Sequence, residues 1–142
     1  MVDTDLPTVA PDYVPTDDED YMGPMMRAYF RGHLLKWRKE LDDTNRETLE
    51  SLQNDSLHVA EVLDRASIET DKALELRTRD RARKLIAKID QAMRRIDTDD
   101  FGYCLDTGEP IGVKRLLARP IATMTVEAQE QKERREKLHS DD

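Results

Sequence analysis

The sequence has few of the residues that several common kinds of protein depend on. It contains one cysteine, Cys104, so no disulfide can form within the chain. Aromatic residues make up 5% of the chain, and apolar residues 37% against 38% charged, which leaves little material for a large compact core. No apolar run approaches the ~20 residues that span a bilayer, and the acidic, proline-containing N-terminus is unlike a signal peptide. These absences predict an extended, helical protein that is soluble in the cytoplasm.

The chain also lacks the basic surplus of a typical nucleic-acid-binding protein. It has 31 acidic and 23 basic residues, a net charge of −8. This balance argues against direct binding to DNA. The charge is uneven, however, because residues 1–20 contain no Lys or Arg while residues 77–95 are rich in both. A local basic face is therefore expected, and it either binds an anionic partner or is solvated and paired with acids on another helix.

No glycine or proline occurs between Gly32 and Gly102, and apolar residues recur in steps of three or four from Met26 to Leu41 and from Ala82 to Ile96. Such spacing places the residues on one face of a helix. The positions are Met26, Phe30, Leu34, Trp37 and Leu41 in the first segment, and Ala82, Leu85, Ile89, Ala92 and Ile96 in the second. The sequence therefore predicts two long helices.

Both apolar faces become polar toward the middle of the stretch, at Thr48 in the first segment and at Glu75 and Thr78 in the second. The two apolar halves can meet only if the helices run antiparallel. We therefore predict an antiparallel coiled-coil hairpin over residues 23–98, with its tip near 55–66, rather than one continuous helix. A hairpin that serves only as a dimerisation module fits the same pattern.

The glycine-rich residues 99–124 predict tight turns and a short β-hairpin in a small globular domain. Its expected core consists of Phe101, Tyr103, Ile111, Leu116, Leu117, Pro120, Ile121, Met124 and Val126. Residues 125–142 predict an exposed C-terminal helix and tail, with Thr125 near the N-cap. Residues 1–22 predict a flexible acidic segment, from which Tyr13, Val14 and Tyr21 are candidates to pack on the globular end. The fold class is mostly α.

Three groups of residues are candidates for chemistry. Asp106, Thr107 and Gly108 match the tripeptide of aspartic proteases, but the two-carboxylate mechanism needs a paired site on a β-rich scaffold. Cys104 is a candidate zinc ligand, yet zinc needs about four ligands and the chain has no other cysteine. Glu61 and Asp64, at the expected tip, are candidates to bind Mg²⁺ or a partner, while Asp64 is equally suited to cap a helix. The sequence thus argues against a protease site at Asp106 and a zinc site at Cys104, and it leaves the roles of Glu61 and Asp64 open.

Three stretches carry a resemblance to a known family. They are residues 76–86 (LRTRDRARKLI), residues 96–104 (IDTDDFGYC) and residues 108–120 (GEPIGVKRLLARP). Over about residues 20–138 the chain resembles the DksA/TraR family. The resemblance implies a bacterial, non-enzymatic transcription factor that binds RNA polymerase and inserts its hairpin into the secondary channel. It implies action with ppGpp in the stringent response, repression of rRNA-type promoters and activation of others, no contact with promoter DNA, and a monomer.

The resemblance also implies site residues. The family carries an Asp-x-x-Asp-x-Ala motif at the tip that acts near the polymerase active site, and the matching residues here are Glu61, Asp64 and Ala66. The family's ppGpp and polymerase-interface positions correspond to Arg81, Leu85, Lys88 and Arg119, which match, and to Gln129, where a Lys is expected. Loss of that cation predicts weaker attraction for phosphate.

The largest departure from the family concerns zinc. Family members commonly carry a C-x2-C-x17-C-x2-C site, and the corresponding positions here are Cys104, Thr107, Thr125 and Ala128. The chain thus resembles a zinc-independent variant, with a small zinc-ribbon-like domain without zinc and no tightly bound cofactor. Two alternatives from other classes are a Gre-like transcript-cleavage accessory, in which Glu61 and Asp64 hold a catalytic Mg²⁺, and a coiled-coil adaptor with no polymerase role.

Overall fold

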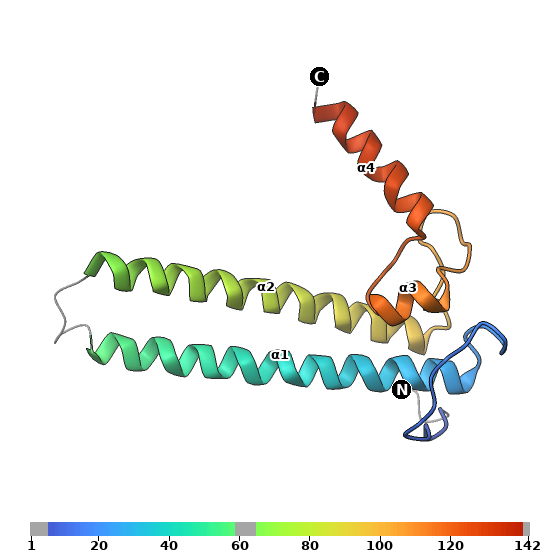
Figure 1. The fold of residues 1–142 in the computed structure, drawn as a ribbon, viewed down its shortest axis with the longest axis horizontal. Helices are drawn as coiled ribbons and strands as arrows, with labels where there is room; N and C mark the ends of the chain where they lie inside the picture. Colours follow the sequence, from blue (N-terminus) through green and yellow to red (C-terminus); the bar gives the residue numbers. More distant parts are fainter. Residues whose placement is uncertain (1–5, 59–64, 141–142) are drawn as a thin grey trace. The chain divides into compact units, whose positions relative to one another are not determined.

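The computed structural model describes residues 6–58 and 65–140. These residues form four α-helices, α1 (Pro24–His58), α2 (Arg65–Asp97), α3 (Val113–Ala118) and α4 (Val126–Ser140) (Figure 1). The described residues contain no β-strand, only an isolated antiparallel bridge between Tyr103 and Pro110. The prediction of a mostly α fold is confirmed.

The chain divides into two compact units, Met1–Leu34 with Gln91–Asp142, and Leu35–Asp90. Each unit contains part of α1 beside part of α2. In the first, Arg31 of α1 forms an ion pair of 3.4 Å with Asp97 of α2. In the second, Arg38 Nε of α1 lies 2.8 Å from Asp90 Oδ1 of α2. The start of α1 thus meets the end of α2, and the predicted antiparallel hairpin is confirmed.

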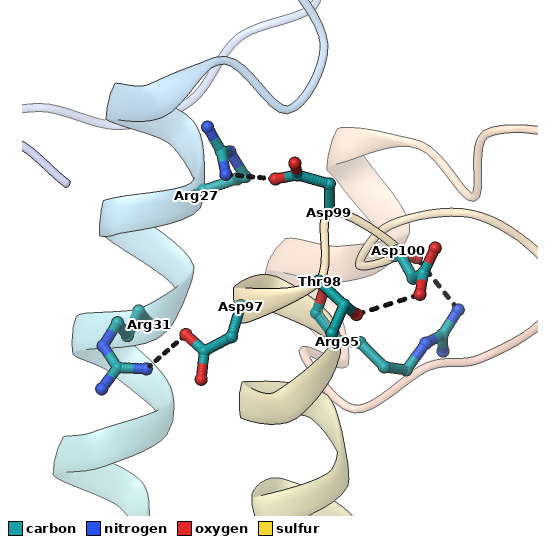
Figure 2. Close-up of polar contacts among 7 residues, drawn as sticks. All are labelled: Arg27, Arg31, Arg95, Asp97, Thr98, Asp99 and Asp100. Carbon is teal, nitrogen blue, oxygen red and sulfur yellow. Dashed lines mark hydrogen bonds and ion pairs between the residues drawn. The ribbon is translucent and has the colours of Figure 1, made fainter. Parts of the chain in front are cut away.

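The ends of the long helices follow from local sequence. α1 begins at Pro24, whose fixed φ suits the first helical position. α2 ends at Asp97, and Asp99 then adopts a left-handed φ of 63° that turns the chain. The Arg95 guanidinium fixes this turn by donating to the carbonyl oxygens of Asp100 at 3.1 Å and Tyr103 at 2.8 Å. Figure 2 shows this turn with the neighbouring Arg27–Asp99 and Arg31–Asp97 pairs.

The helical faces predicted from the sequence are buried. In α1, Met26, Phe30 and Leu34 are at most 1% exposed. In α2, the buried residues of the predicted face are Ala82, Ile89, Ala92 and Ile96. Trp37, Leu41 and Leu85 are half-buried. The register of both helices is therefore as predicted.

The small globular part differs from the prediction in three respects. Leu117 is 37% exposed and Val126 is 45% exposed, so their assignment to the core is wrong. Residues 113–118 form the unpredicted helix α3, which turns Val113 and Leu116 inward and Leu117 outward. The predicted short β-hairpin is reduced to a single bridge. Three glycines with positive φ, Gly102, Gly108 and Gly112, bend the chain too often for extended strands.

Residues 6–22 contain no helix or strand, yet several of their side chains make defined contacts. Tyr13 lies edge-to-face against Tyr29 of α1, and its hydroxyl donates to the Glu19 carboxylate. Tyr21 packs on the globular part, as predicted, whereas Val14 is 54% exposed, contrary to the prediction. The flexibility of residues 1–22 and the domain boundaries drawn from the sequence stay predictions.

Candidate functional site

Three of the four positions that correspond to the family's zinc ligands meet at one thiol. Cys104 is buried, and its sulfur accepts hydrogen bonds from the Thr107 hydroxyl and from backbone N–H groups that include that of Thr125. The Thr125 hydroxyl oxygen in turn accepts the Ala128 N–H at 3.1 Å, which caps the start of α4 as predicted. The structure thus brings Thr107 and Thr125 to the Cys104 thiol, whereas Ala128 is bonded to Thr125 in the first turn of α4.

These hydrogen bonds change the acidity of that thiol. Burial disfavours the charged thiolate, but the Thr107 hydroxyl and the backbone N–H groups of Thr125, Thr107 and Asp106 outweigh it. Together they lower the pKa of Cys104 to about 7. The position therefore stabilises a sulfur anion by hydrogen bonding at a point where the family places a metal ligand.

Arg81, Leu85 and Lys88 lie within the Leu35–Asp90 unit, on α2. Their spacing of four and then three residues places them on one face of the helix. Arg81 and Lys88 are exposed, and Leu85 is half-buried. This face offers a guanidinium and an ammonium to an anion, with an apolar side chain between them.

Arg119 and Gln129 belong to the other unit. Arg119 is exposed and follows α3, where its backbone N–H donates to the Arg115 carbonyl oxygen at 2.7 Å. The Gln129 side chain donates to Glu133 one turn further along α4, at 3.1 Å. The structure thus places three of the five predicted interface residues on one helical face and the other two in a separate unit.

The predicted tip lies largely outside the described residues. Glu61 and Asp64 lie outside the described residues, since α1 ends at His58 and α2 begins at Arg65. Ala66 belongs to the first turn of α2. The assignment of these three residues to the tip stays a prediction.

Tyr21 is an organising residue whose partners sequence reasoning did not identify. Its hydroxyl donates to the Gly102 carbonyl oxygen at 2.6 Å and accepts the Gly112 N–H at 3.0 Å. Arg115 plays a similar part, since its Nε donates to the Met124 carbonyl oxygen at 2.9 Å. The only sequence signal was the position of Tyr21 just before the Gly23-Pro24 break, which does not specify a distant partner.

Comparison with known proteins places these features in a family. Residues 26–96 match the family described as "DnaK suppressor protein DksA, N-terminal domain", and residues 99–134 match "Prokaryotic dksA/traR C4-type zinc finger". A Caulobacter vibrioides protein named RNA polymerase-binding transcription factor DksA is 56% identical over 131 residues, 92% of each chain. The chain belongs to the DksA family. The resemblance predicted from the sequence is confirmed.

Two further DksA relatives agree. The Escherichia coli K12 protein of the same name is 40% identical over 119 residues, which cover 84% of this chain and 79% of that one. The solved structure of transcription factor DksA2 from Pseudomonas aeruginosa matches with a TM-score of 0.78 and 39% identity, covering 84% of this chain and 94% of that one. The helical hairpin with a small C-terminal part is thus a fold shared with a DksA protein.

The DksA zinc-finger match implies a zinc ion, and the residues present do not fit one. Structural zinc takes about four Cys or His ligands. Here the four positions supply one thiol, two hydroxyls and a methyl group, and the Thr125 hydroxyl oxygen is occupied by the Ala128 N–H. Among the described residues, no group of three or more His, Cys, Asp or Glu side chains is arranged to hold a metal ion.

Among the helices that the structure describes, none has the length and apolar character to cross a membrane.

Proposed function

We propose that this chain binds RNA polymerase and regulates transcription without catalysing a reaction. The observation that carries the proposal is the 56% identity, over 92% of the chain, to a protein named RNA polymerase-binding transcription factor. The match also covers 92% of that relative's own length. An acidic protein of net charge −8 suits regulation through a protein partner rather than through direct binding to promoter DNA.

We infer that the hairpin enters the secondary channel of the polymerase and presents Asp64, with Glu61 and Ala66, near the active centre. The sequence supports this role because these residues lie between the end of α1 and the first turn of α2. A Glu at the first position of the motif keeps the charge and adds one methylene. The outcome is repression of rRNA-type promoters and activation of others, by a monomer in the cytoplasm.

We further infer that ppGpp binds at the interface with the polymerase and acts there in the stringent response. Exposed Arg81 and Lys88 on one face of α2 suit the phosphates, and Leu85 between them suits an apolar contact. Arg119 is an exposed guanidinium of the other unit, and its assignment to ppGpp rests on the resemblance in sequence. Gln129 provides an amide where the family has an ammonium, so the response to ppGpp is weaker than with a Lys.

We also propose that the protein folds and acts without zinc or any other tightly bound cofactor. A single thiol among the four zinc-ligand positions supports this, because metal binding then contributes no folding free energy. Treatment with EDTA should leave the helical content by circular dichroism and the transcriptional effect unchanged. Loss of either on chelation would contradict the proposal.

Transcription in vitro from a ribosomal promoter tests the function. The intact protein should repress the promoter, and ppGpp should strengthen repression. Asp64→Asn should lose repression while keeping its affinity for polymerase, whereas Asp71→Asn, at an exposed carboxylate of α2, should act like the intact protein. Equal repression by Asp64→Asn would remove the tip from the mechanism. RNA shortening in backtracked complexes that requires Glu61 and Asp64 would show instead a transcript-cleavage accessory.

A further inference from the structure

The Leu35–Asp90 unit has its buried side chains toward one end. Among the described side chains of this unit, only Ala82 and Ile89 are buried, at 6% and 0% exposure. Equal numbers of residues along antiparallel helices reach the same level, so, counted from the Arg38–Asp90 pair, residues 47–50 of α1 are level with residues 78–81 of α2. No described side chain at or beyond that level in this unit is buried. We call residues 47–58 of α1 and 70–81 of α2 the distal arm.

The polar residues that continue the apolar seam into the distal arm do not strengthen the pairing of its helices. The Thr48 hydroxyl donates to the Thr44 carbonyl oxygen of its own helix at 3.0 Å, and the Thr78 hydroxyl donates to that of Leu74, also at 3.0 Å. One carboxylate oxygen of Glu75 is buried and has no hydrogen-bond donor among the described residues. A hydroxyl bonded to its own helix adds nothing across the seam, and a buried oxygen without a donor opposes closure.

The separate helices of the distal arm are weak as well. Glu47 and Glu50 on α1 are like charges three positions apart, and Arg77 and Arg81 on α2 are like charges four positions apart. Such pairs destabilise a helix. Isolated helices shorter than ~12–15 residues are marginal in water, and neither segment of the arm is longer than this. Each helix of the arm therefore depends on the other to stay folded.

We propose that the distal arm opens as one unit in the folded protein, with both of its helices unfolding together while the Arg38–Asp90 end stays closed. This is local unfolding, which costs less free energy than unfolding of the whole chain. The polar seam residues Thr48, Glu75 and Thr78 set the closed fraction. A partner that contacts both helices of the arm binds only the closed form and shifts the population toward it. The inference concerns the chain on its own and does not depend on the proposed function.

Hydrogen exchange of the full-length protein, followed by mass spectrometry, measures this opening. The amides of residues 47–58 and 70–81 should exchange at least about a hundredfold faster than those of residues 26–34 and 89–96, which carry the buried faces. Low concentrations of urea should speed exchange in residues 47–58 and 70–81 in parallel, because the two segments expose their surface in one step. Equal protection of the distal arm and the buried faces would overturn the proposal.

Glu75→Leu tests whether the two helices open together. An apolar side chain on the seam favours the closed arm, so exchange should slow about tenfold in residues 70–81 and, across the hairpin, in residues 47–58. Asp71→Leu is the matched control, because it removes a carboxylate from an exposed position of the same helix. It should leave exchange in residues 47–58 within about twofold of the unchanged chain. Thr48→Leu is the reciprocal variant on α1 and should slow exchange in residues 70–81.

Two results with the variants would contradict cooperative opening. Slower exchange confined to the substituted helix would show that the two helices fray separately. An equal effect of Asp71→Leu and Glu75→Leu would show that charge or helix propensity, and not the seam, controls exchange. Circular dichroism checks that every variant folds, and Thr48→Leu retains the test if Glu75→Leu does not.

Discussion

The hydroxyl of Tyr21 donates a hydrogen bond of 2.6 Å to the carbonyl oxygen of Gly102, 81 residues further along the chain. The same hydroxyl accepts the N–H of Gly112 at 3.0 Å, and the Tyr21 ring lies edge-to-face against Tyr103. Burial raises the pKa of Tyr21, so the hydroxyl keeps its proton and donates at neutral pH. One side chain from the N-terminal segment therefore links two glycines on either side of the Tyr103–Pro110 bridge.

Replacing Tyr21 by Phe should lower the free energy of unfolding by about 1–3 kcal/mol, because two backbone groups lose their partner in a partly buried place. Urea denaturation followed by circular dichroism measures this change. Tyr103→Phe is the control, since its hydroxyl has no hydrogen bond among the described residues and its ring contact is kept. Equal stability of the two variants would show that the link does not contribute.

Gly102 and Gly108 both have positive φ, 91° and 76°, but their surroundings differ. A Cβ at Gly102 would lie 2.9 Å from the Met22 Cε and 3.1 Å from the Tyr21 hydroxyl, whereas a Cβ at Gly108 would have nothing within 4 Å. Gly108→Ala should therefore cost only backbone strain, about 1 kcal/mol. Gly102→Ala should cost about 1–3 kcal/mol more, because Met22 and Tyr21 must also move. Urea denaturation of both variants checks the difference, and equal losses would contradict it.

The Cys104 thiol should titrate near pH 7 in the folded protein, below its ordinary value of 9.0. Thiolate absorbance against pH measures the midpoint, and Thr107→Val should raise it because the hydroxyl that stabilises the anion is lost. A pKa that is lower in the folded state stabilises the protein above pH 9.0, and this contribution disappears as pH falls through about 7. The free energy of unfolding should thus rise between these pH values.

Cys104→Ser provides the matching control, since it removes the titrating group. That variant should lack the part of the rise that comes from the thiol. A titration midpoint of Cys104 near 9.0 in the unchanged protein would refute the proposed stabilisation of the thiolate. An identical rise in the free energy of unfolding in the Cys104→Ser variant would refute it as well.

Arg38 bonds two carboxylates, Asp90 across the hairpin and Asp42 one turn along α1, each at 2.8 Å. Hydrogen bonding to Asp90, followed by its charge, raises the pKa of Arg38. Asp90→Asn should cost about 0.5–1 kcal/mol, and Asp42→Asn about 0.3–0.5 kcal/mol, since only the first pair joins two helices. Urea denaturation at low salt and at about 1 M salt measures both losses. High salt screens the ion pairs, so it should reduce both losses and the difference between them. A larger loss of stability for Asp42→Asn than for Asp90→Asn would contradict the prediction that the pair between the helices contributes more.

The predictions that succeeded depended on local spacing. The absence of Gly and Pro between Gly32 and Gly102, with apolar residues every three or four positions, indicated both long helices and the faces that they bury. Thr125 was recognised as a cap for the same reason, because an N-cap bonds a residue only three positions away. The predicted interface residues Arg81, Leu85 and Lys88 share a face of α2 because a helix fixes that relationship in advance.

The predictions that failed required knowledge of the turns. Leu117 and Val126 are apolar, and composition alone placed them in the core, but α3 and the start of α4 point them to solvent. The direction of a side chain in residues 99–126 depends on three glycines with positive φ, and a glycine in the sequence does not reveal which sign it will adopt.

The sequence by itself determined two long antiparallel helices, their buried faces and the DksA family, because helical periodicity and motif identity can be read along the chain. Only the tertiary structure revealed the Tyr21–Gly102 link and the hydrogen bonds that lower the pKa of Cys104. Helix formation depends on neighbours three or four residues away. A hydrogen bond between residues 81 positions apart depends on the path of the whole chain between them.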